Sequence, residues 1–128
     1  MATSTNPTGI LWVENDVWGN PVDLSQEDWA HACLHPEMVG QEDAVRETIK
    51  KPDHVREGRY HDSAAHTGSI SSTNPEGIRV MVRYERENFL DGKTAGHVTT
   101  AIPINTSKYP SPRLRGILWQ PTESEGNK

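Results

Sequence analysis

Cysteine, long apolar runs and secretion signals are nearly absent from this sequence. Cys33 is the only cysteine, so the chain cannot form an internal disulfide or a metal site of several thiolates, and it fits a reducing compartment. No run approaches the ~20 apolar residues that a membrane-spanning helix needs. The first residues also lack the basic and apolar regions of a signal peptide. We therefore expect a cytoplasmic protein that makes no membrane contact.

Aromatic residues are scarce as well. They make up 6% of the 128 residues, the hydrophobic fraction is 33%, and the chain has nine prolines and ten glycines. Such a composition supports a small core with many loops, and the length suits a single domain. We expect one domain over residues 9–119, with disordered ends at residues 1–8 and 120–128.

Basic residues are too few to coat the surface. The formal net charge is -5, which argues against general electrostatic adhesion to nucleic acids or membranes. The charge is also uneven, because nine acids and one base, Arg46, precede residue 50, whereas the remainder holds twelve bases and nine acids. The domain therefore carries either opposite charges on different faces or an ordinary mixed surface.

Common catalytic and metal-binding motifs are missing too. The chain has no glycine-rich phosphate loop and no nucleophile elbow. His31 and His35 have the four-residue spacing of a zinc-protease helix, but Ala32 stands where that motif has its glutamate. We expect neither a metal ion nor a cofactor.

Two helices are predicted in the first half of the chain. Ser25 is a capping residue with an acid three positions later, which predicts a helix that turns Trp29 inward and ends before Pro36. A second helix is predicted over residues 41–51, where an apolar stripe is followed by two lysines and Pro52.

Strands are predicted in the second half. Residues 78–84 alternate between an apolar face and a face with Arg83, and residues 97–104 form their antiparallel partner, with Val98 and Thr100 on one face. Residues 54–61 are a more irregular strand, while residues 62–77 suit a hairpin tip, a loop or a low-propensity strand. This order indicates an α+β fold.

A tetrapeptide, Gly-Ile-Leu-Trp, occurs at residues 9–12 and again at residues 116–119. Two copies are too few for a repeat protein. The repetition indicates two similar terminal strands that pair and close the domain, or it is a coincidence.

Cations and hydroxyls on these strands, together with a histidine-bearing helix, point to metal-free RNA cleavage. That reaction needs a base for the 2′-hydroxyl proton, a cation for the phosphorane-like oxygens and an acid for the leaving 5′-oxygen. Arginine suits the middle role because its planar fork binds phosphate oxygens. Each candidate also has an ordinary structural role: His31 as a surface histidine, Arg83 as the partner of a carboxylate, and Thr100 as a β-former.

A series of short motifs from Leu24 to Ile104 resembles a family of nucleases. The motifs are Trp29-Ala-His31, His35-Pro36-Glu37-Met38, Glu47-Thr48-Ile49-Lys-Lys-Pro52-Asp53, Arg59-Tyr60, Ile78-Arg-Val80-Met-Val82-Arg83 and Val98-Thr-Thr100-Ala101. This pattern is similar to that of the BECR-fold (barnase, EndoU, colicin and RelE-like) small proteins of phages and bacteria. The resemblance implies two N-terminal helices packed on a curved antiparallel β-sheet of about four strands. It also implies a metal-independent ribonuclease, often of the toxin type.

The resemblance further implies roles for single residues. His31 or His35 would be the helix-borne acid/base, Arg59 and Arg83 the phosphate-binding cations, and Thr100 the strand hydroxyl. The aromatic-rich strand that usually follows Arg-Tyr is replaced here by residues 63–74. This difference leaves open two alternatives: an inactive member of the family that binds, or one that has a structural role.

These patterns lead to one leading prediction and two alternatives. The leading prediction is an endoribonuclease with RNA contacts from Arg56, Tyr60, Lys108, Arg113 and Arg115. The first alternative is a non-catalytic interaction protein, an acidic phage or bacterial inhibitor whose residues 25–47 mimic a polyanion for a cognate partner protein. The second is a module that holds RNA by its basic residues 108–115 without cutting it.

Overall fold

The computed structural model describes residues 9–69, 77–104 and 116–121. Within these residues the chain forms a single sheet in the order β1-β2-β6-β5-β4-β3-β7, with two α-helices. The strands are β1 (Ile10–Asn15), β2 (Pro21–Ser25), β3 (His54–Glu57), β4 (Ser63–Ser69), β5 (Gly77–Tyr84), β6 (Gly96–Ile104) and β7 (Ile117–Trp119), and the helices are α1 (Gln26–Ala32) and α2 (Glu42–Lys50). The predicted RNA contacts Lys108, Arg113 and Arg115 lie outside the described residues.

The predicted arrangement of two N-terminal helices on about four antiparallel strands is wrong. The hairpin of β1 and β2 precedes both helices, and the described sheet has seven strands. The sheet is also not purely antiparallel, because β2 runs parallel to β6. The turn between Asn15 and Pro21 reverses the chain so that β2 pairs back onto β1.

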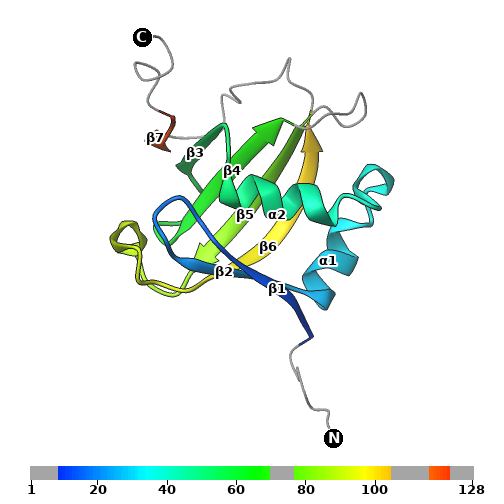
Figure 1. Ribbon diagram of the computed structural model, residues 1–128, viewed down its shortest axis with the longest axis horizontal. Helices are drawn as coiled ribbons and strands as arrows, with labels where there is room; N and C mark the ends of the chain where they lie inside the picture. The colour runs from blue at the N-terminus through cyan, green and yellow to red at the C-terminus, as the bar shows by residue number, and fades with distance from the viewer. Residues whose placement is uncertain (1–8, 70–76, 105–115, 122–128) are drawn as a thin grey trace, which may run out of the picture.

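Both helices pack on one face of this sheet. Ser25 caps α1 as predicted, since its hydroxyl accepts a hydrogen bond from the Asp28 amide at 3.0 Å. Helix α2 buries Val45, Thr48 and Ile49, and Figure 1 shows it crossing β4 and β5 while α1 lies beside β6. Neither helix is long and apolar enough to cross a membrane, within the described part of the chain.

The alternation predicted for β5 is confirmed. Its apolar face is buried in the same cluster as residues of both helices, so we call this side the inner face and the opposite side the outer face. In β6, however, the predicted common face of Val98 and Thr100 is wrong. Val98 pairs with Val82 but Thr100 pairs with Met81, so a bulge near Thr99 turns Thr100 to the outer face.

Strand β4 lies within residues 62–77, the segment for which the sequence allowed a hairpin tip, a loop or a strand. Its residues from Ser63 to Gly68 are small or medium-sized and are all buried between β3 and β5. The two Gly-Ile-Leu-Trp segments do not pair with each other, because β1 and β7 form opposite edges of the sheet. Each edge strand instead uses its apolar residues to pack against the end of the core.

A buried polar network fastens the β1–β2 turn to the centre of the sheet. The Tyr84 hydroxyl donates to Asp16 Oδ2 at 2.6 Å and lies 3.1 Å from His66 Nε2. Asp16 also accepts hydrogen bonds from the Asn20 backbone and side chain. Gly96 lets β6 approach the same tyrosine, since a Cβ there would lie 2.8 Å from its ring.

Candidate functional site

A row of polar residues crosses four neighbouring strands near one end of the outer face. Ser63 in β4 pairs with Arg83 in β5, Arg83 pairs with His97 in β6, and His97 pairs with Asp23 in β2. Directly paired residues on neighbouring strands point to the same face of a sheet. The row therefore lies on the side that the helices leave uncovered.

His97 lies between two carboxylates. Its Nδ1 is 3.0 and 3.1 Å from the two Asp23 oxygens, and its Nε2 is 2.9 Å from Glu85 Oε2. Partial burial opposes the charged ring, but hydrogen bonds to Asp23 and Glu85 outweigh it and raise the pKa of His97 above its usual value. The arrangement joins an oriented histidine ring to a carboxylate that is more than half exposed.

Arg83 lies next to this pair. Its Nε donates to Asp62 Oδ1 at 2.5 Å, and its guanidinium carbon is 4.5 Å from the centre of the Tyr60 ring. About half of the side chain is exposed. In its contacts with other described residues, the Arg83 side chain donates a hydrogen bond only from Nε. The two terminal nitrogens are therefore available to a bidentate anion such as phosphate.

A tight turn between β3 and β4 holds Tyr60 in position. The Ser63 hydroxyl accepts from the Tyr60 amide at 2.9 Å and donates to the Tyr60 carbonyl at 2.8 Å. Gly58 is required here because a Cβ would collide with Ser63. The guanidinium carbon of Arg59 lies 5.8 Å from the Tyr60 ring, so two arginines flank one aromatic side chain.

The structure thus brings together part of the predicted site. Arg59 and Arg83 meet at Tyr60. Thr100 shares the outer face with Arg83 because it pairs with Met81, and Arg56 shares it because it pairs with Ala65, itself the partner of Met81.

The two predicted helix histidines lie elsewhere. His31 is exposed in the last turn of α1, and His35 is exposed just after that helix, on the inner-face side of the sheet. No hydrogen bond, ion pair or ring contact between described residues joins either histidine to Arg59, Arg83 or Thr100. Residues 9–69, 77–104 and 116–121 contain no group of three or more ligands that could hold a metal ion.

Three residues beside Arg83 on the outer face, Asp23, Glu85 and His97, were not predicted as site residues from the sequence. Glu85 extends the alternation of β5 by one step beyond Arg83, which was a usable signal. Asp23 and His97 meet only because β2 pairs in parallel with β6 across 74 residues of sequence. No local pattern indicates such a pairing.

A groove of about 450 Å³ opens beside Tyr60. Its lining residues come from the β3–β4 turn, the β5–β6 loop and β7, and are Glu57, Gly58, Arg59, Tyr60, His61, Ser63, Glu87, Phe89, Leu90 and Leu118. The groove and the polar row therefore share Ser63, and Tyr60 of the groove lies beside Arg83 of the row.

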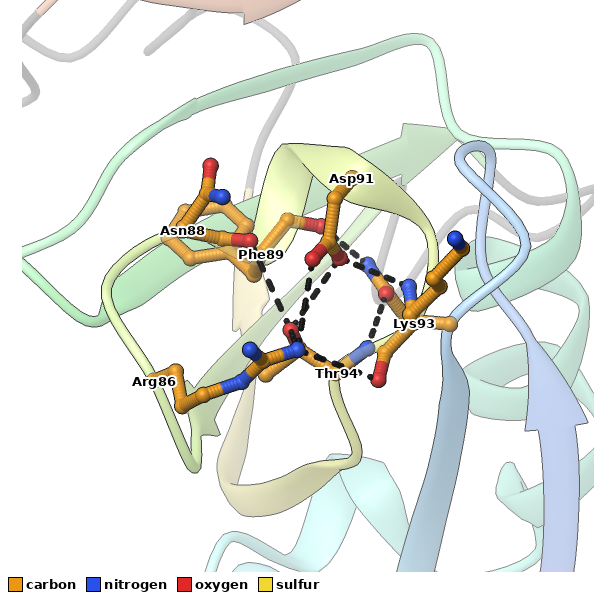
Figure 2. A network of polar contacts seen from close by, with 7 residues as sticks. Arg86, Asn88, Phe89, Asp91, Lys93 and Thr94 are labelled. Carbon is orange, nitrogen blue, oxygen red and sulfur yellow. Dashed lines mark hydrogen bonds and ion pairs between the residues drawn. The ribbon is translucent and has the colours of Figure 1, made fainter.

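The β5–β6 loop that forms one side of the groove is held by its own polar network, which Figure 2 shows. Arg86 donates to the side chains of Asp91 and Thr94 at 3.2 and 2.9 Å. Asn20 joins this loop to the β1–β2 turn, donating to the Phe89 carbonyl at 2.6 Å and accepting from the Thr94 amide at 2.8 Å. These contacts fix the loop that presents Phe89 to the core.

Comparison of this chain with protein-family models, curated proteins and solved structures gives no match.

Proposed function

We propose that this chain is a metal-independent endoribonuclease, in keeping with its resemblance to BECR-fold nucleases, and that it acts at the outer face of its sheet. The observation that carries the proposal is the pairing of Arg83 with His97 across β5 and β6, with Glu85 bound to the same histidine. An acid, a base and a phosphate-binding cation thereby lie together on one exposed surface.

Each group has a task in cleavage by the neighbouring 2′-hydroxyl. Glu85 accepts the proton of that hydroxyl, whose oxygen then attacks phosphorus. Arg83 and Arg59 stabilise the charge that develops on the non-bridging oxygens. His97, oriented by Asp23, donates its proton to the leaving 5′-oxygen. The products are a 2′,3′-cyclic phosphate and a free 5′-hydroxyl. When RNA binds, Glu85 and His97 give up their hydrogen bond to each other and contact the substrate instead.

The test is cleavage of a fluorescent single-stranded RNA in the presence of EDTA. We expect Arg83→Ala to lower the cleavage rate by about 10²–10³-fold, the usual effect of removing one group that stabilises transition-state charge. Full activity in this variant would overturn the assigned role of Arg83.

Arg46→Ala is the matched control. Arg46 is as exposed as Arg83, pairs with Glu14 at 2.9 Å and lies 5.7 Å from the Trp12 ring, but it belongs to α2. It therefore reproduces the ion pair and the aromatic contact away from the proposed site. Loss of activity in both variants would indicate a general charge effect.

A second comparison assigns the acid. We expect His97→Gln to abolish most of the cleavage, while His31→Gln and His35→Gln retain it. The opposite result would assign the acid/base role to the helix histidines of the sequence prediction. Salt-sensitive RNA binding without any cleavage by the wild-type protein would contradict an enzymatic function.

A further inference from the structure

The groove beside Tyr60 has the size of a small-ligand site. Its volume of about 450 Å³ falls within the ~300–1,000 Å³ that such sites usually have. Tyr60 lines the groove and also lies under the guanidinium of Arg83. A nucleotide whose phosphate is bound by Arg83 therefore has its base within reach of the groove.

Two exposed apolar side chains make the groove suitable for a flat ring. Tyr60 is 52% exposed and Leu90 is 50% exposed, and both line it together with the partly buried Leu118. An aromatic side chain stacks on any nucleobase. Neither Tyr60 nor Leu90 is part of the buried core, so packing alone does not account for their presence at this place.

The polar groups of the groove favour one kind of base. Glu57 and Glu87 both line it and both are exposed. An ionised carboxylate only accepts hydrogen bonds, so it pairs with the exocyclic amino group of adenine, cytosine or guanine. Uracil has carbonyl oxygens at both positions beside its one N–H group, and these repel a carboxylate.

We propose that this groove is the base-binding subsite of the enzyme, and that it takes a nucleobase with an exocyclic amino group in preference to uracil. The inference rests on the proposed ribonuclease function, because Arg59 and Tyr60 serve both the groove and the phosphate site. Glu57 and Glu87 act here in binding and take no part in proton transfer.

The kinetic test compares poly(A), poly(C) and poly(U) as substrates in EDTA. We expect wild-type protein to cleave poly(A) and poly(C) roughly ten-fold or more faster than poly(U), the discrimination that one hydrogen bond to a charged group supplies. Glu87→Gln and Glu57→Gln each offer an amide N–H to uracil, so the ratio should fall and cleavage of poly(U) should persist. The control Glu47→Gln, on the exposed side of α2, should keep the wild-type ratio. Equal cleavage of all three polymers by the wild type, or a ratio that neither groove variant changes, would overturn the inference.

A binding measurement separates this inference from the proposed function. AMP, CMP and UMP are titrated into the protein while the methyl NMR signals of Leu90 and Leu118 are followed. Shifts with AMP and CMP at roughly ten-fold lower concentration than with UMP support the groove, even if no polymer is cut. Absence of cleavage alone contradicts the enzyme, and equal or absent shifts with all three nucleotides contradict the subsite.

Discussion

Acidification should destabilise the fold through His66. This side chain has no exposed surface, and burial lowers its pKa from 6.5 to about 4, although the nearby Asp16 carboxylate opposes the change. In the unfolded chain the same ring takes up its proton near pH 6.5. Between these two pH values the ring is protonated in the unfolded state but not in the folded state. The free energy of unfolding therefore falls as the pH falls through this window.

The size of the effect follows from the difference between the two pKa values. A lowering from 6.5 to about 4, at ~1.4 kcal/mol for each pKa unit, corresponds to about 3 kcal/mol of folding free energy. This stability is present at pH 7 and is lost by about pH 4. Small domains have a total stability of only ~5–15 kcal/mol, so the loss is large enough to measure.

Urea unfolding followed by tryptophan fluorescence at several pH values between 7 and 4 measures the effect. His66→Gln is the reference, because it keeps a polar side chain and does not titrate. Other groups, such as His54, whose pKa is lowered by burial, contribute equally to both proteins. The difference between the two pH profiles should change by about 3 kcal/mol across the window. Parallel profiles for the wild type and the variant would refute the reasoning.

Two further changes test the neighbouring buried network and the site. Tyr84→Phe keeps the ring that stacks on Phe89 at 4.2 Å but removes the hydroxyl shared by Asp16 and His66. It should lower the free energy of unfolding, measured in urea, by about 3 kcal/mol because two buried groups lose a partner. A loss below about 0.5 kcal/mol would contradict the network. Asp23→Asn removes a carboxylate that helps to raise the pKa of His97, so the alkaline limb of the kcat/KM profile should move to lower pH while the fold persists; an unmoved limb would exclude His97 as the acid.

The features that could be predicted from the sequence are those that depend on near neighbours. The cap at Ser25 and the alternation of β5 need only a few consecutive residues, and both are confirmed. The pairing of β2 with β6 depends on contacts across the whole chain and has no local signature. The same holds for the bulge near Thr99, which reversed the face expected for Thr100.

The candidate site was predictable to a similar extent. Arg59, Tyr60 and Arg83 were identified by residue type and strand position, and the structure joins them through a turn fastened by Ser63. The position of His97 between two carboxylates was not predictable, because Asp23 belongs to β2, which the sequence did not predict as a strand.

The distribution of charge over the fold bears on how RNA would bind. Helices α1 and α2 begin with acids, Glu27 and Glu42 among them, and both pack on the inner face. On the outer face, the proposed enzyme would offer RNA the terminal nitrogens of Arg83 and the nearby guanidinium of Arg59. Two phosphate contacts release few counterions and give weak electrostatic affinity. RNA binding by the proposed enzyme would therefore draw on stacking against Tyr60 and on the groove beside it, so its base selection and its affinity would depend on the same few side chains.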